Sequence, residues 1–262
     1  MRHYSLFHPL YLAFYSKSLY KDVAKNWKGT GLAYLLLLLA LAWIPVMIVF
    51  HYDLSREITR EAPPIINQVP KVTITRGEVS VDAPVPYIII EPKTGAQLMV
   101  IDTSGRIASP NQTPALVLLT KKQLFVKKQR QAETRIYDLS SIESLTIDRE
   151  RVNGWAEAFR KWFAFAAYPF TVIGLFIYRL VQMLIYALIG MLFAKIVKAN
   201  LEYVTLIRLA AVSITPVIIL NAARRMLDIS IPYVGLLSFL IAMGYLFFAV
   251  KAGAEREAGQ PV

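Results

Sequence analysis

The chain alternates between long apolar runs and one long polar stretch. Residues 32–50 carry no charged side chain, a polar stretch follows as far as Lys161, and apolar segments then continue almost to the C-terminus. A helix of roughly 20 apolar residues is long enough to cross about 30 Å of hydrocarbon. The pattern therefore predicts an α-helical integral membrane protein with about four spans and one soluble domain inserted between the first two.

The first apolar run is predicted to be an uncleaved membrane anchor. A cleaved signal peptide is the alternative, but the run is too long for one and no small-residue cleavage pattern follows Trp43, Ile44 and Pro45. We therefore expect the first transmembrane helix at residues 31–50. The last span is predicted at Ile229–Val250, with Pro232 in its first turn, where proline costs least.

The region between these spans has two interpretations. Residues 162–194 are apolar apart from Arg179 and Gln182, whereas residues 209–223 are uncharged but shorter than a full span. A hairpin at Arg179 would give five spans and place the C-terminus outside. Residues 177–181 contain no Gly, Pro, Asn or Asp, which a turn there would need. One long helix, tilted or kinked near Pro169, is the simpler prediction. Residues 162–250 then form a bundle of three helices.

The distribution of basic residues also favours four spans. Lys and Arg near span ends concentrate on the cytoplasmic side of membrane proteins. With four spans, the cytoplasmic residues are Arg2, Lys17, Lys21, Lys25, Lys28, Lys195, Lys198, Lys251 and Arg256, with Arg224 and Arg225 as exceptions. This predicts a multi-pass membrane protein with both termini and the tail 251–262 in the cytoplasm. The domain at 51–161 would be extracytoplasmic, in the periplasm of a cell with two membranes.

Residues 1–30 show a helical pattern ahead of the first span. Apolar side chains recur at spacings of three and four from Phe7 to Trp27. Aromatic and lysine residues beside a span are typical of a cytoplasmic amphipathic helix that lies in the membrane interface. The predicted interface residues are Lys17, Lys21, Lys25, Trp27 and Lys28. An equally good interpretation is a helix whose apolar face packs on the other spans.

The polar stretch from 51 to 161 predicts a mainly-β domain. Apolar residues alternate on both sides of the Arg76-Gly77 pair, which indicates a hairpin over 72–81. Further strands are predicted at Tyr87–Ile90, Leu98–Ile101, Leu116–Thr120, Leu124–Lys127 and Thr134–Tyr137. The prolines of Glu61–Pro70 predict an extended connector. Residues 149–161 are expected to form a helix that returns to the interface.

Charge and composition exclude several classes of site. The net charge is +11, but residues 51–161 hold 16 Lys and Arg against 13 Asp and Glu, so +8 of the +11 lies in the rest of the chain. Contact with anionic lipid head groups explains those charges, and we expect no nucleic-acid partner. The absence of cysteine rules out disulfides and thiolate zinc sites, and the three histidines form no ligand-like pair. We therefore expect neither a metal nor a cofactor.

Three short features carry candidate chemistry. Asp102-Thr103-Ser104-Gly105 follows an apolar strand like the Asp-Thr-Gly of aspartic proteases, but an inserted serine and the lack of a second copy favour a local turn. Arg179 lies in a predicted span, where a cation normally faces the bundle interior, and Gln182 and Asn221 are its candidate partners. Pro216 predicts a helix kink, which suits either a cavity or simple helix packing.

Several strings resemble a known family. They are the run from Ser16 to Gly29 that leads into Tyr34, Arg76-Gly77-Glu78-Val79, the stretch from Val100 to Gly105, Glu133-Thr134-Arg135-Ile136-Tyr137, and Thr215-Pro216. Together they resemble bacterial membrane proteins of the domain-of-unknown-function 1189 family, which is distantly similar to Yip-type multi-span proteins. The resemblance covers nearly the whole chain and implies architecture rather than activity. Together with the predicted topology, it implies a multi-pass protein of the bacterial inner (cytoplasmic) membrane.

The sequence contains no catalytic constellation, so a non-enzymatic role is expected. Our first interpretation is a scaffold or accessory component whose extracytoplasmic β-domain binds a protein or envelope ligand. The alternative is a lipid or small-solute transporter that uses Arg179, Gln182 and Asn221 in the bundle, with the kink at Pro216. A third interpretation is a membrane hydrolase at Asp102.

Overall fold

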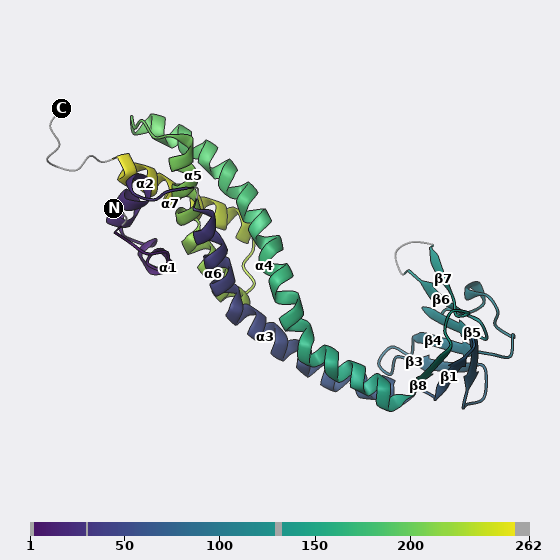
Figure 1. The fold of residues 1–262 in the computed structure, drawn as a ribbon. Helices are drawn as coiled ribbons and strands as arrows, with labels where there is room; N and C mark the ends of the chain where they lie inside the picture. The colour runs from purple at the N-terminus through teal and green to yellow at the C-terminus, as the bar shows by residue number, and fades with distance from the viewer. Residues whose placement is uncertain (1–2, 30, 129–132, 255–262) are drawn as a thin grey trace. The chain divides into compact units, whose positions relative to one another are not determined.

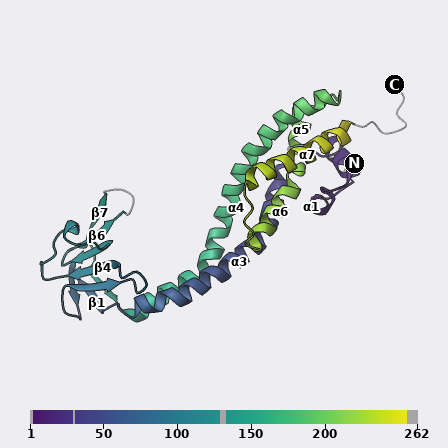
Figure 2. The ribbon, with the colours of Figure 1, turned by 180° about the vertical axis from the view of Figure 1, so that it is seen from behind.

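The computed structural model describes residues 3–29, 31–128 and 133–254. The chain divides into two compact units: unit 1 is Met1–His51 with Ala164–Val262, and unit 2 is Tyr52–Phe163. Figure 1 labels the elements of both units, and Figure 2 shows them from behind. Unit 1 is helical, whereas unit 2 combines two β-sheets with the adjoining parts of two helices.

Four helical segments in the described residues are long and apolar enough to cross a membrane. They are α3 (Leu32–Ile66), α4 (Arg149–Ile196), α5 (Tyr203–Ser213) together with α6 (Thr215–Met226), and α7 (Val234–Ala254). Helix α4 is continuous through Arg179, which confirms the prediction of one long helix and excludes a hairpin there. Helix α7 begins at Val234, so Pro232 precedes the helix instead of lying in its first turn.

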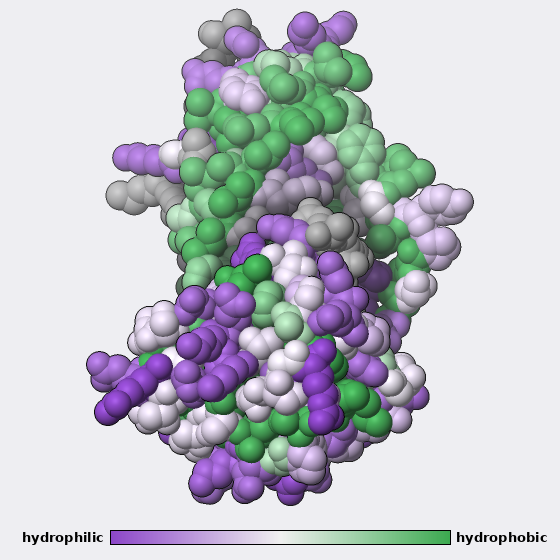
Figure 3. Space-filling model, turned by 90° about the vertical axis from the view of Figure 1, so that its right-hand side faces the viewer, coloured by the Kyte–Doolittle hydropathy of each residue, from purple (hydrophilic) through white to green (hydrophobic). Residues whose placement is uncertain are grey.

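The spans of unit 1 differ in burial. The most apolar window of the α5–α6 segment is 72% buried, against 22% in each of the other three spans. These other spans carry large apolar side chains on their outer faces, such as Phe170 with 76% of its surface exposed. The visible surface of unit 1 is accordingly largely green in Figure 3. Soluble monomers rarely expose so much apolar surface, which is consistent with a multi-pass membrane protein.

The third span is interrupted next to the predicted kink. Helix α5 ends at Ser213 and α6 begins at Thr215, so the break lies at Ile214, just before Pro216. Proline has no N–H group to continue the helical ladder, which explains the break. The fully buried hydroxyls of Tyr34 and Thr215 are hydrogen-bonded at 2.6 Å, which ties α3 to this point of the bundle.

The N-terminal segment forms two short helices in place of one. They are α1 (Pro9–Leu12) and α2 (Lys17–Lys25), and the Ser16 side chain caps α2 by accepting from the N–H of Leu19 at 3.2 Å. Leu19, Tyr20 and Val23 are fully buried, because α2 packs on α5 and α7. The apolar face of α2 is therefore a packing face within unit 1, whereas Phe7, Tyr11 and Tyr15 earlier in the predicted pattern are exposed.

Unit 2 contains all the strands predicted from the sequence and one that was missed. The strands are β1 (Val72–Thr75), β2 (Glu78–Val81), β3 (Tyr87–Ile90), β4 (Gln97–Asp102), β5 (Val117–Thr120), β6 (Gln123–Lys127), β7 (Thr134–Asp138) and β8 (Ser144–Ile147). They form a three-stranded sheet in the order β2-β1-β8 and a five-stranded sheet in the order β3-β4-β5-β6-β7. Among the strands of the described residues, only β4 and β5 pair in parallel. The missed strand is β8, which pairs with β1.

Both faces of the five-stranded sheet bury apolar side chains. Ile101 and Leu119 pack with residues of the three-stranded sheet, including Val72, Ile74 and Val79. The opposite face is formed by residues that are aligned across adjacent strands and therefore point to the same side of the sheet. These are Ile88, Val100, Leu118, Phe125 and Ile136. Ala115 and Ile107 cover the middle of this row, which leaves its two ends open to solvent.

The predicted extended connector at Glu61–Pro70 is wrong over its first half. Helix α3 continues to Ile66 through Pro63 and Pro64. Each proline removes only its own N–H donor from the helical ladder, and the carbonyl of Pro63 still accepts from the N–H of Asn67 at 2.9 Å. Ile65 and Ile66 thereby join the apolar face of this helix.

Candidate functional site

The candidate binding site is an apolar groove of about 480 Å³ in unit 2. It lies between the end of α3 and the beginning of α4, which run side by side in both Figure 1 and Figure 2. Its lining residues are Ile58, Ala62, Ile65, Ile66, Val152, Trp155, Ala156 and Phe159. The volume falls within the range of ligand-binding pockets, and every lining side chain is apolar or aromatic.

Helical periodicity in both segments produces the groove. On α3 the lining positions follow one another at intervals of four, three and one, and on α4 at three, one and three. These intervals place each set on one face of its helix. Ala62 and Ala156 are the small members of the two sets, and their methyl groups leave room between the larger side chains. The helical spacing of these residues is present in the sequence, but it was overlooked because the stretch containing Pro63 and Pro64 was interpreted as extended.

The aromatic residues of the groove are accessible. Trp155 is 54% exposed and Phe159 is 48% exposed, whereas Ile66 at the other side is buried. The ring of Phe159 lies 4.5 Å from that of Phe163 between centroids. Tryptophan and other aromatic side chains are enriched at binding surfaces, because they bury a large area at a small cost in conformational entropy.

Charged residues of both signs flank the lining. Glu57 and Glu61 both bond to Arg60, at 3.4 and 2.6 Å, and Glu157 pairs with Arg160 at 2.5 Å. Glu57, Glu61, Glu157 and Arg160 are each adjacent in sequence to a lining residue, and Arg60 lies two residues from Ile58 and Ala62. Such exposed pairs add little to stability. An apolar centre with a polar rim is the arrangement found in protein–protein interfaces.

The predicted polar site of the bundle is divided into two networks. Arg179 donates to the side-chain oxygen of Gln182, whose amide nitrogen lies 2.7 Å from the hydroxyl of Tyr186. Asn221 belongs to a separate network, in which it donates to Val217 O at 2.9 Å and contacts Ser238 Oγ at 3.0 Å. The structure therefore brings Arg179 and Gln182 together but leaves Asn221 elsewhere.

Arg179 lacks an acidic partner within the described part of the chain. Its Nε is buried without a hydrogen-bond partner, and its guanidinium lies 5.4 Å from the ring centre of Tyr178. None of the ion pairs between described residues includes it. A cation in a span without a counter-charge is costly, so this position has capacity for an anionic group.

Asp22 organises the N-terminal segment, which sequence reasoning did not foresee. Its buried carboxylate accepts from the N–H groups of His3 at 3.0 Å and Tyr4 at 3.3 Å, and from the side chains of Asn26 at 2.8 Å and Trp27 at 3.2 Å. Burial alone would raise the pKa of Asp22, but these hydrogen bonds outweigh it and lower the pKa below its usual value.

Arg208 holds the other end of α2. Its guanidinium donates to the carbonyls of Trp27 and Ala24 and to the hydroxyl of Thr205. The last carbonyls of a helix lack partners within the helix, and a cation there also complements the helix dipole. Trp27, a predicted interface residue, is buried beside this contact. Of the predicted interface lysines, Lys17, Lys25 and Lys28 are exposed and Lys21 is half-buried.

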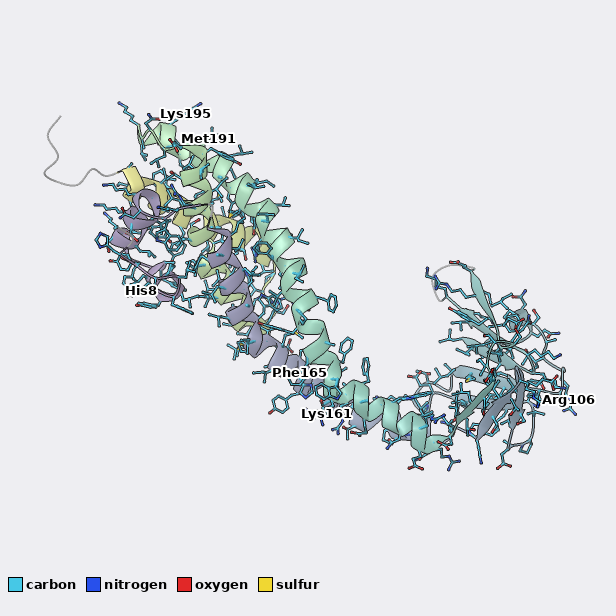
Figure 4. All side chains as sticks on the ribbon, in the orientation of Figure 1. His8, Arg106, Lys161, Phe165, Met191 and Lys195 are labelled. Carbon is cyan, nitrogen blue, oxygen red and sulfur yellow. The ribbon has the colours of Figure 1, made fainter. Side chains whose placement is uncertain are left out.

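Asp102 forms the local turn predicted for it. The buried carboxylate accepts from the N–H of Ser104 at 2.8 Å, from its hydroxyl at 2.6 Å, and from the N–H of Ile107 at 2.5 Å. Burial opposes ionisation, but these bonds and the nearby Arg106, labelled in Figure 4, lower the pKa of Asp102. Both carboxylate oxygens are thus engaged in shaping the loop that follows β4.

Comparison with known proteins identifies a family that matches most of the chain. Residues 7–250 match the family described as Protein of unknown function (DUF1189). The chain belongs to the DUF1189 family. The DUF1189 match contains the first three of the four apolar helical segments, the fourth as far as Val250, and the whole of unit 2, so the groove and the bundle networks are both inside it.

A curated protein is also similar to part of the chain. The "Uncharacterized protein RP489" of Rickettsia prowazekii (strain Madrid E) is 28% identical over 134 residues, which is 46% of this chain. The match spans about half, 45%, of that relative's length. No solved structure matches the chain. The description of the DUF1189 family assigns no activity, so any function must be argued from the geometry.

Proposed function

We propose that this member of the DUF1189 family is a non-enzymatic membrane scaffold whose unit 2 binds a protein partner in the groove between α3 and α4. The observation that carries the proposal is the groove itself, with its apolar lining, exposed Trp155 and Phe159, and flanking charges. A third, amphipathic helix is the segment best suited to a groove between two helices. The Glu57, Arg60 and Glu157 side chains then provide the polar rim.

The proposed setting is the bacterial inner membrane. In this proposal four spans leave both termini in the cytoplasm and unit 2 on the outer side of the membrane, so that the exposed Lys17, Lys25 and Lys28 would contact anionic head groups. The distribution of Lys and Arg along the sequence supports this orientation.

Photo-crosslinking in native membranes tests the binding role. A photoreactive residue replaces Ala62 or Ala156 in the groove, and the exposed Ala96 or Ala108 of unit 2 in the controls. We expect both groove positions to cross-link the same protein and the controls to give no such product. Phe159→Asp should abolish the product, because a charge in an apolar groove opposes desolvation. The same product at all four positions, or none at the groove, would refute the proposal.

A second role, the transport of an anionic lipid or solute, is favoured by the uncompensated Arg179. Under this role Arg179→Leu and Arg179→Lys should differ, because only the second retains the charge that would attract an anion. Lipid adducts at Ala62 and Ala156, combined with loss of a cellular phenotype in Arg179→Leu alone, would favour transport over the scaffold.

A further inference from the structure

The edges of the two sheets in unit 2 are unequally protected. Gln68 covers β3, since its side-chain amide donates to Ile90 O and accepts from the N–H of Ile90, both at 3.0 Å. The N–H of Val79 on β2 donates to Lys121 O at 2.8 Å. On β8, Arg151 donates to Thr146 O. Unprotected strand edges pair readily with other chains, and these contacts are three ways of preventing it.

Strand β7 has no such protection among the described residues. It is the last strand of its sheet, and Arg135, Ile136, Tyr137 and Asp138 are all exposed, Ile136 to 59% and Tyr137 to 47%. An exposed edge strand with an isoleucine on one face and a tyrosine on the other is a template for an added strand.

The hydrogen-bond pattern shows which backbone groups face outward. The N–H of Lys128 donates to Glu133 O at 3.1 Å, and the N–H of Leu139 donates to Lys122 O at 3.0 Å. In an antiparallel pair, hydrogen-bonded positions alternate. The backbone groups of residues 135 and 137 therefore form hydrogen bonds with β6, as those of residues 133 and 139 do. The N–H and C=O groups of Thr134, Ile136 and Asp138 point to the open edge.

We propose that β7 pairs antiparallel with β7 of a second copy of this chain, about a two-fold axis at Ile136. This register pairs the whole strand, because residue 134 meets 138 of the other copy and 135 meets 137. The outward groups of Thr134, Ile136 and Asp138 then form hydrogen-bonded pairs that each exchange two bonds. The two five-stranded sheets become one continuous sheet, with the isologous contact expected of a two-fold dimer.

The side chains are self-complementary in this register. Ile136 meets Ile136 of the other copy at the solvent-open end of the apolar row that starts at Ile88. Arg135 meets Tyr137, and a guanidinium beside an aromatic ring is a favourable cross-strand pair. Thr134 meets Asp138, which suits a hydroxyl-to-carboxylate hydrogen bond. Arg135 forms no ion pair within the described residues, so it remains available for this contact.

The dimer is independent of the proposed groove and is tested separately. The full chain is purified in lipid nanodiscs and its mass is measured by light scattering, for the natural sequence, Ile136→Lys and Ile88→Lys. Ile88 is the matched control, since it is 41% exposed on the same sheet but on the edge covered by Gln68. We expect dimers for the natural chain and Ile88→Lys, and monomers for Ile136→Lys. Monomers of the natural chain, or dimers of Ile136→Lys, would overturn the proposal.

Cysteine cross-linking checks the register without relying on a disruptive variant. The chain contains no cysteine, so each introduced thiol is unique. Ile136→Cys lies on the axis and should form a disulfide with itself under mild oxidation. Arg135→Cys and Tyr137→Cys should cross-link each other when mixed, but not themselves, because positions equidistant from the axis meet only their counterparts. Absence of the Ile136→Cys disulfide, or equal cross-linking of Ile88→Cys, would contradict the two-fold pairing.

Discussion

Replacing Gly77 by alanine should open the three-stranded sheet of unit 2. Gly77 has a φ of +79°, and an added Cβ would lie 2.6 Å from Ser140 Cα and 3.2 Å from Leu139 O. Its own N–H donates to Ile142 O at 2.9 Å, while that of Arg76 donates to Glu143 O at 2.8 Å. The β1–β2 turn is therefore pressed against the backbone that leads into β8, and no flexible side chain can move aside.

Two contributions to the cost can be separated. A positive φ costs an alanine roughly 1–2 kcal/mol. Relief of the backbone overlap moves the turn away and weakens its two hydrogen bonds, at about 1 kcal/mol each. Gly95 and Gly105 supply matched controls, because their φ values are +69° and +83° and an added Cβ at either meets nothing within 4 Å. We expect Gly95→Ala and Gly105→Ala to incur only the cost of the positive φ. Gly77→Ala should incur both costs and lower the free energy of local opening by about 3–4 kcal/mol.

Hydrogen exchange with mass spectrometry on the full chain in detergent measures this difference. Peptides covering β1, β2 and β8 should exchange faster in Gly77→Ala than in the natural chain, by a factor corresponding to the lost free energy of local opening. The controls should leave these peptides nearly unchanged. Equal exchange in all three variants would refute the claim that the turn is held by backbone contact.

Three further changes test other parts of the molecule. Asp22→Asn should release residues 3–8 and lower the free energy of unfolding by about 1.5–3 kcal/mol, as the loss of hydrogen bonds to a charged group does. Acidification should cause the same release, because the pKa of Asp22 is lower in the folded than in the unfolded chain. The contribution of Asp22 to stability is complete above about pH 4 and is lost as the pH falls through the folded value. Exchange of the N-terminal peptides reports both effects, and unchanged protection at pH 3 would contradict them. Phe125→Ala should lower the free energy of unfolding of unit 2 in denaturant by about 3–5 kcal/mol, because Phe125 is buried in one cluster with Leu118 and Ala115. A decrease below about 1 kcal/mol would show that this face of the sheet is not a core. Arg208→Met should increase protease cleavage after Lys25 by leaving the carbonyl of Ala24 without its donor, and unaltered cleavage would mean that the contact does not hold α2.

Local patterns predicted the secondary structure well, because strand alternation and turn chemistry are short-range signals. The Arg76-Gly77 turn and the continuity of α4 through Arg179 are examples. The prolines at 63 and 64 misled because proline weakens a helix without always ending it, and α3 continues through both to Ile66. Strand β8 was missed because its partner β1 lies about 70 residues away in sequence.

The candidate site was less predictable for the same reason. Each wall of the groove has a helical period of its own, but only the fold brings Ile58 and Trp155 to one groove. The carboxylate of Asp22 and the guanidinium of Arg208 likewise acquire their roles from partners that the sequence does not identify. The contact of Arg179 with Gln182 follows from a spacing of three on one helix, whereas the separation of Arg179 from Asn221 depends on how different helices are rotated.

The proposed topology has four spans and unit 2 on the side of the membrane opposite the termini. The cysteine-free chain allows a direct test with the single variants Lys28→Cys, Ser104→Cys, Asn200→Cys and Ser230→Cys, labelled by a membrane-impermeant maleimide before and after cell lysis. With this topology, we expect Ser104→Cys and Ser230→Cys to react in cells with a permeabilised outer membrane. Lys28→Cys and Asn200→Cys should react only after lysis. Labelling of Asn200→Cys before lysis, or protection of Ser104→Cys, would contradict it.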